Sequence, residues 1–224
     1  MANQSKNFIS FVALGGLNPQ ILNIDFLKVN SIISINDPPF DKLLKQGAAP
    51  DTFISVPGLV ANLVVANIEI FVDQQRLQIR DTKVSEWSET KILDIANKYF
   101  QVLPYTPLKL VGVNFNSTIM FDTSKEAQDF QELFFPRNNP LAQIISKQGI
   151  NASSMLRYPY SDSGNHSRIQ LTIEQPDTEN KRRVVNVNYE FDFTGWESFK
   201  NELKRVPEIG KYCDHILEQF LKVI

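Results

Sequence analysis

The clearest alternation of apolar and polar residues lies in the last third of the chain. From Val185 to Phe193 every second residue is apolar, and asparagine or acidic residues fill the positions between them. A period of two predicts a β-strand with one face in the core and one face in water. Apolar positions in 155–160 and 169–173 predict two preceding strands, joined by a turn at 162–165. We expect these three strands to pair antiparallel.

The first 121 residues contain further strand patterns, separated by glycine, proline and polar turns. We predict strands over residues 8–14, 32–35, 64–72, 77–79 and 108–121. The third and fourth of these flank Gln74 and Gln75, which favours a hairpin. Residues 46–58 (QGAAPDTFISVPG) are rich in turn residues, so we expect a loop there.

Apolar stripes with helical spacing follow both groups of strands. The spacing predicts helices over 86–102, from Thr123 to Pro136, over 196–206 and from Glu208 to the end, and shorter helices near Pro19 and over 140–149. Ser85 or Ser88 is suitably placed to cap the first helix. Thr123 with Glu126, and Thr194 with Glu197, match the capping-box spacing. Pro207 is expected to separate the last two helices, because proline cannot donate a backbone hydrogen bond.

The chain predicts neighbouring strands joined by short turns, and each group of strands is followed by helices. This order favours an α+β fold, in which an antiparallel sheet packs against amphipathic helices. We expect one compact unit over 1–224, with a subdivision into 1–150 and 151–224 as the alternative. Residues 63–135 and 151–224 share a loose plan of hairpin, amphipathic helix and further helix. Two similar β-hairpin-plus-helix halves are therefore a hypothesis, although no residue-level repeat supports it.

Composition and charge narrow the functional classes. The 224 residues are 42% hydrophobic and include 16 Phe, which is globular composition. With 23 basic and 25 acidic residues the net charge is -2, so no global positive field steers the chain to nucleic acid or anionic membranes. A lone cysteine cannot form an internal disulfide, the N-terminus is a poor signal peptide, and no apolar stretch is long enough to span a bilayer. These features favour a cytoplasmic protein with no membrane association.

The stretch KYCDHILEQF places Cys213, Asp214 and His215 side by side, which suggests a nucleophile, an acid and a base. On a helix, however, successive residues are separated by about 100°, so Cys213 and His215 lie on opposite faces. Cys213 shares its face with Ile216, Leu217, Phe220 and Ile224. We therefore expect a buried Cys213, with Asp214 and His215 facing water or a partner, and no catalytic residue here.

Other candidate ligand-binding residues lie around the last strands. His166 belongs to the polar loop SDSGNHSR, and loops often carry functional groups. A second group comprises Arg157, Arg168, Lys181, Arg182 and Arg183, in or beside the same predicted sheet. One hypothesis is a modest anion or nucleic-acid site; the favoured interpretation is a solvated hairpin end with a charged strand edge that resists aggregation. Gly15 and Gly16 lack the flanking residues of a phosphate-binding loop and indicate a turn. Two histidines and one cysteine give no metal-site pattern.

The C-terminal third resembles the C-terminal part of a sporadically distributed family of uncharacterised prokaryotic proteins. The resemblance rests on a strand rich in Tyr and Phe that leads into a helix, and on a terminal helix with His215 and Phe220 in the sequence HILEQF. It implies an α+β fold and an intracellular microbial origin. That family has no assigned chemistry, so the resemblance gives His215 no role.

We therefore expect a non-catalytic binding or assembly protein without cofactors or metals, whose partner is another protein or a second copy of the chain. A homodimer would form through sheet edges or the C-terminal helix. One alternative is an enzyme of unrecognised type with a site near His166 or residues 46–58. Another is a nucleic-acid binder that uses the basic residues around the last strands.

Overall fold

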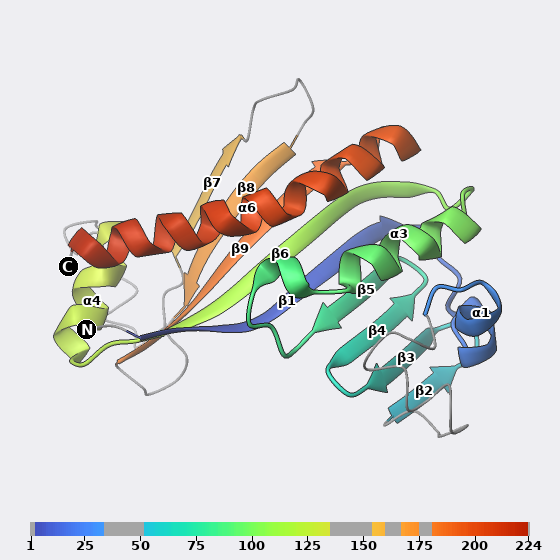
Figure 1. Cartoon of the computed structure of the whole chain (residues 1–224), viewed down its shortest axis with the longest axis horizontal. Coiled ribbons are helices and arrows are strands. Elements are labelled where there is room, and N and C mark those ends of the chain that lie inside the picture. The colour runs from blue at the N-terminus through green and yellow to red at the C-terminus, as the bar shows by residue number, and fades with distance from the viewer. Residues whose placement is uncertain (1–2, 34–51, 135–153, 160–166, 175–180, 224) are drawn as a thin grey trace.

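The protein contains one large antiparallel sheet. The computed structural model describes residues 3–33, 52–134, 154–159, 167–174 and 181–223. Within these residues nine strands form a sheet in the order β2-β3-β4-β5-β1-β6-β9-β8-β7 (Figure 1). The strands are β1 (Asn3–Gly15), β2 (Thr52–Val56), β3 (Val60–Val65), β4 (Ile68–Asp73), β5 (Arg76–Asp81), β6 (Leu108–Met120), β7 (Ser154–Pro159), β8 (Ser167–Glu174) and β9 (Arg182–Asp192).

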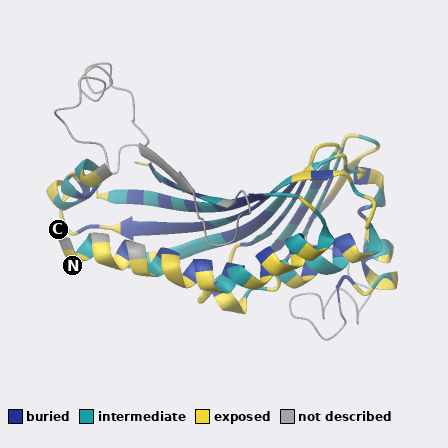
Figure 2. Ribbon diagram, turned by 90° about the horizontal axis from the view of Figure 1, so that it is seen from above, coloured by how far each residue is buried: buried dark blue, intermediate teal, exposed yellow. Residues whose placement is uncertain are grey.

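The helices complete an α+β fold, as the sequence predicts. They are α1 (Ile24–Val29), α3 (Ile92–Val102), α4 (Ser124–Phe134) and α6 (Trp196–Val223), with short 3-10 turns η1 (Pro19–Ile21) and η2 (Trp87–Glu89). Helix α6 runs diagonally across the sheet, and α3 and α6 lie on the same side of it (Figures 1 and 2). The possible boundary at residue 150 does not divide the sheet, since β9 pairs with β6 along eleven residues, Leu110–Met120.

The hydrophobic core lies between the sheet and this layer of helices. Phe11 of β1 pairs with Val113 of β6, which pairs with Tyr189 of β9, and all three side chains are fully buried. The helices contribute Phe100 and Phe199, whose rings lie 6.3 and 6.2 Å from that of Phe11. Because side chains alternate along each strand, residues one position away from this row point to the opposite face of the sheet.

Helix α6 differs from the prediction, because it continues through Pro207 for 28 residues. A proline in a helix interior loses one backbone hydrogen bond and costs about 3 kcal/mol. Buried residues flank it on both sides: Phe199 and Val206 precede it, and Ile209 follows. The shared apolar stripe keeps both halves of the helix on the same sheet, which offsets the local loss.

Several strand predictions were wrong in detail. The predicted strand 64–72 is two strands, because Ala66 adopts a left-handed conformation (φ 51°) and the chain reverses at Ala66–Asn67 between β3 and β4. Strand β2 lies inside the predicted loop 46–58. Ile32 and Ile33 are buried but form no strand; both backbone N–H groups donate to the carbonyl of Leu27, at the end of α1.

The helix starts show which capping predictions are correct. Thr123 Oγ1 accepts from the Glu126 N–H (3.1 Å), which confirms the N-cap half of this capping box; the Glu126 carboxylate accepts from the N–H of Asp122 (3.2 Å), one residue before the cap. The predicted helix 86–102 is η2 followed by α3, and neither has a side-chain cap. At α6 the residue before the first turn is Gly195, whose φ of 144° suits glycine, rather than Thr194. The predicted helix 140–149 and turn 162–165 lie outside the described residues.

Candidate interaction surface

The face of the sheet opposite α3 and α6 is lined by polar side chains, and we call it the polar face. Paired residues place these side chains in rows across the strands. In one row Ser10 of β1 pairs with Asn114 of β6, Asn114 with Asn188 of β9, and Asn188 with Gln170 of β8. The polar face comprises Phe8, Ser10, Phe71, Gln78, Arg80, Asn114, Asn116, Arg168, Gln170, Thr172, Arg182, Asn186, Asn188 and Glu190.

Weak hydrogen bonds connect the amides at the centre of this face. Asn186 Nδ2 donates to Asn114 Oδ1 at 3.3 Å, and Asn114 Nδ2 donates to Ser10 Oγ at 3.4 Å. Well-formed N–H···O bonds have donor–acceptor distances of about 2.7–3.2 Å, so both contacts are long. Each amide side chain can make up to four hydrogen bonds, and therefore retains capacity for an outside group.

Asn188 lies at the centre of the polar face, directly over Gly112. Its Nδ2 donates to Glu190 at 3.3 Å, and its Oδ1 has no hydrogen-bond partner within the described part of the chain. A Cβ on Gly112 would lie 3.0 Å from this oxygen, so the glycine makes room for the amide. The Asn188 Oδ1 is therefore a hydrogen-bond acceptor shielded from solvent, on a face with many other donors and acceptors.

Most guanidinium groups on the polar face are paired with carboxylates. Arg168 forms an ion pair with Glu190 and lies 3.5 Å from Asp192, and hydrogen bonding to Glu190 raises the pKa of Arg168 although burial opposes this. Arg80 lies 3.4 Å from Glu69, and its guanidinium stacks over the Phe8 ring at 4.6 Å. These pairs neutralise the face locally, so it presents hydrogen-bonding groups and little net charge.

The structure does not bring the predicted basic residues together on one face. Arg168 and Arg182 belong to the polar face, whereas Arg183 pairs with the core residue Ile119 and is 3% exposed. Burial lowers the pKa of Arg183, and its Nη1 donates to the Arg182 carbonyl at 2.7 Å. Lys181 is exposed in the turn before β9. Arg157 pairs with Gln170 through the backbone, while its side chain and all of His166 lie outside the described residues.

The cysteine, aspartate and histidine near the C-terminus do not form a site. Cys213 is 1% exposed on the core side of α6, whereas His215 is exposed. Asp214 accepts from Trp87 Nε1 at 2.8 Å and lies 3.1 Å from Lys6 Nζ. Asp214 thus holds β1 and η2 to α6. Leu217 is buried as predicted, and the side chains of Ile216 and Phe220 are not described.

The thiol of Cys213 is expected to be unreactive in the native protein. Burial raises its pKa above the usual thiol range, and the neighbouring Asp214 charge adds to this effect, so little thiolate exists at neutral pH. An aromatic disulfide reagent should therefore release its coloured thiol only after urea unfolds the chain. Rapid, stoichiometric release from the folded protein would contradict the burial of Cys213.

The described residues provide neither a metal centre nor a membrane-spanning helix. They contain no group of three or more His, Cys, Asp or Glu placed to hold a metal ion. Among the same residues, no helix combines the length and apolar character that crossing a membrane requires. The outer side of α6 exposes charged residues, including Lys200, Lys204, Glu208 and Lys211. The apolar stripe of α6 is already used against the sheet.

Comparison with known proteins gives no family assignment. No protein-family model matches the chain, and no curated protein matches it. The resemblance of the C-terminal third to an uncharacterised prokaryotic family therefore stays a prediction. The candidate site depends on the geometry of the polar face alone.

Proposed function

We propose that this chain is a non-catalytic binding or assembly protein whose polar face binds a protein partner. The observation that carries the proposal is the group of three amides Asn114, Asn186 and Asn188 on the polar face: the first two make only long hydrogen bonds, and the Asn188 Oδ1 has no partner within the described residues. Buried or half-buried polar groups that lack partners are unfavourable in the free protein. A partner that supplies peptide N–H and C=O groups would satisfy them.

The charge distribution favours a protein partner over nucleic acid. Binding to a phosphate backbone needs several cations that are free to displace counterions. On the polar face Arg80 and Arg168 are already paired with Glu69 and Glu190, and each pair would have to be broken first. A neutral surface with many hydrogen-bonding groups complements this face without that cost.

The outer side of α6 is less suited to be the contact surface than the polar face. Interface centres are depleted in charged residues and enriched in aromatic residues. The outer side of α6 exposes several lysines and glutamates, whereas the polar face includes the rings of Phe8 and Phe71 beside its amides. A second copy of the chain is one protein that could bind there, and its binding would make the mass depend on concentration.

Replacing Asn114 and Asn186 together by alanine should abolish partner binding and leave the fold intact. Their side-chain hydrogen bonds are long and only partly buried, so the free energy of unfolding should fall by no more than about 1 kcal/mol. Native mass measurements on tagged protein from its own cells would compare the wild type with this variant. The matched control is Asn201→Ala, an exposed asparagine of α6. A complex that survives the double substitution, or a strict monomer for the wild type, would count against the proposal.

A further inference from the structure

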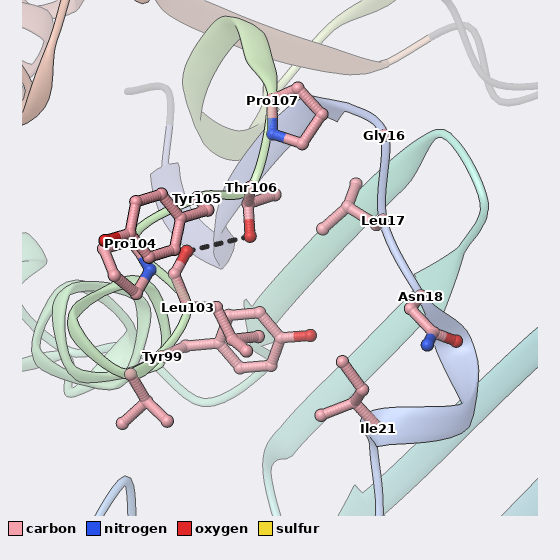
Figure 3. Close-up of a pocket in the computed structure, with 11 residues that line it drawn as sticks. Gly16, Leu17, Asn18, Ile21, Tyr99, Leu103, Pro104, Tyr105, Thr106 and Pro107 are labelled. Carbon is pink, nitrogen blue, oxygen red and sulfur yellow. Dashed lines mark hydrogen bonds between the residues drawn. The ribbon is translucent and has the colours of Figure 1, made fainter.

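A separate pocket lies at the edge of the helix layer, away from the polar face. Its volume is about 380 Å³, and two segments line it: residues 16–21, which follow β1, and residues 99–107, which form the end of α3 and the loop to β6. Figure 3 shows these two segments facing each other across the pocket. Its size is at the lower end of the range for sites that bind small molecules.

Close backbone packing holds the two walls in place. The Gly16 N–H donates to the Pro107 carbonyl at 3.1 Å, and a Cβ on Gly15 would lie only 2.3 Å from the same oxygen. On the other wall, Thr106 Oγ1 donates to the Leu103 carbonyl at 2.9 Å, as the dashed line in Figure 3 marks. The indole of Trp196 donates to the Pro104 carbonyl at 2.6 Å. The pocket is thus built on fixed backbone positions.

Tyr99 supplies the unusual polar group of this pocket. The residue is 1% exposed, and its hydroxyl has no hydrogen-bond partner among the described residues. Figure 3 shows the hydroxyl pointing from α3 toward the wall formed by Leu17, Asn18 and Ile21. Burial raises the pKa of Tyr99 to about 12, so the phenol stays protonated and can donate. A buried hydroxyl without a partner costs about 1–3 kcal/mol, which a suitable ligand would recover.

The remaining lining defines the chemistry of such a ligand. The walls are mainly leucine, isoleucine, valine, proline and tyrosine, and among the described residues no charged side chain lines the pocket. The carbonyl end of α3 faces this region and disfavours anions. Asn18 Oδ1 already accepts from the Gln20 N–H at 3.0 Å, so the group that Asn18 offers is its amide N–H₂. Tyr99 and Asn18 can therefore each donate a hydrogen bond to a ligand.

We infer that this pocket binds a small uncharged molecule with an aromatic or branched apolar body and one carbonyl-type oxygen, which accepts a hydrogen bond from Tyr99. The apolar body would lie between Leu103, Pro107 and Ile21. The Tyr99 hydroxyl is shielded from solvent. Binding therefore requires the side chain of Leu17 or Ile21, on the facing wall in Figure 3, to rotate and admit the oxygen of the ligand. This inference is independent of partner binding at the polar face.

The test uses acetophenone as the probe and α-methylstyrene as its matched hydrocarbon, which has the same shape without the oxygen. Methyl NMR of the full chain should show saturable shifts at Leu17, Ile21 and Leu103 with acetophenone, and none at the remote Ile173. The hydrocarbon should bind about two- to tenfold more weakly. Absence of saturable shifts up to the solubility limit, or equal binding of both probes, would overturn the inference.

Tyr99→Phe separates ligand binding from folding. The variant should bind acetophenone about two- to tenfold more weakly, down to the level of α-methylstyrene. In the free protein it should unfold at a urea concentration equal to or higher than the wild type, because the unpaired hydroxyl is gone. Tyr105→Phe is the control, since that side chain is 96% exposed and its hydroxyl is not shielded. Unchanged binding by Tyr99→Phe would disprove the role of the hydroxyl.

Discussion

Gly15→Ala should lower the free energy of unfolding by about 3 kcal/mol or more. This is the largest effect we expect, although the substitution removes no existing contact. Gly15 lies where β1 passes the start of β6, and a Cβ there would be 2.3 Å from the Pro107 carbonyl oxygen and 2.9 Å from Leu108 Cα. Both obstacles are backbone atoms, of Pro107 just before β6 and of Leu108 at its first position, so neither can rotate away. Urea unfolding followed by circular dichroism would measure the change.

The neighbouring Gly16 gives the matched control. A Cβ at Gly16 would lie 3.0 Å from Pro107 Cγ, an atom of a ring that can change its pucker. Gly16→Ala should therefore cost only about 1 kcal/mol. Equal midpoints for Gly15→Ala and the wild type would show that β1 and the loop before β6 do not approach as closely as the structure shows.

Asp81→Ala should have the second largest effect and lower the free energy of unfolding by about 2–4 kcal/mol. Asp81 is 6% exposed at the end of β5. Its Oδ1 accepts from Asn67 Nδ2 (2.6 Å) and from the Lys83 N–H (3.1 Å), and its Oδ2 accepts from Thr90 Oγ1 (3.0 Å). One carboxylate thus connects the β3–β4 turn, the end of β5 and the approach to α3. Removal leaves three donors without this acceptor.

Asp73→Ala is the comparison for this prediction. Asp73 also accepts two backbone N–H groups, those of Gln75 and Arg76, each at 2.7 Å, but in an exposed turn where water can replace it. Its loss should cost about 1 kcal/mol. Thermal unfolding monitored by fluorescence would rank the two variants. A milder effect at Asp81 than at Asp73 would contradict the assigned role of Asp81.

The sequence predicted the parts of the fold that local periodicity determines. Strict alternation marked β9, and the buried row Val185, Val187, Tyr189 and Phe191 confirms it. The apolar stripe with helical spacing around Cys213 likewise predicted that Cys213 and Leu217 are buried, and both are. Each pattern reports which face of an element is apolar, and this information is sufficient to identify an α+β fold.

Features that depend on packing between distant residues were not predictable in this way. The continuity of α6 through Pro207 depends on a sheet that holds both halves of the helix. The reversal at Ala66 uses a left-handed alanine, which turn statistics do not favour. Asp214 is bound by Trp87 and Lys6, residues more than 120 positions earlier in the chain.

The sequence predicted which residues of single strands belong to the polar face, but not how these residues lie beside one another. The polar positions of β9 were recognised as a wet face, and in β6 the polar residues Asn114 and Asn116 alternate in the same manner with the apolar residues Val113 and Phe115. What the sequence lacks is the register that places Asn114 beside Asn188 and Asn116 beside Asn186. The basic triplet shows the opposite error, since alternation within β9 sends Arg182 and Arg183 to different faces.

Site-specific photo-cross-linking in the source cells tests partner binding at the polar face most directly. A benzophenone amino acid would replace Asn114 or Asn186 on the polar face, and Lys204 or Lys211 on the outer side of α6 as controls. We predict discrete, protease-sensitive adducts at Asn114 and Asn186, and none at the two lysine positions. Nuclease-sensitive adducts, adducts confined to α6, or no adduct at any position would contradict the account.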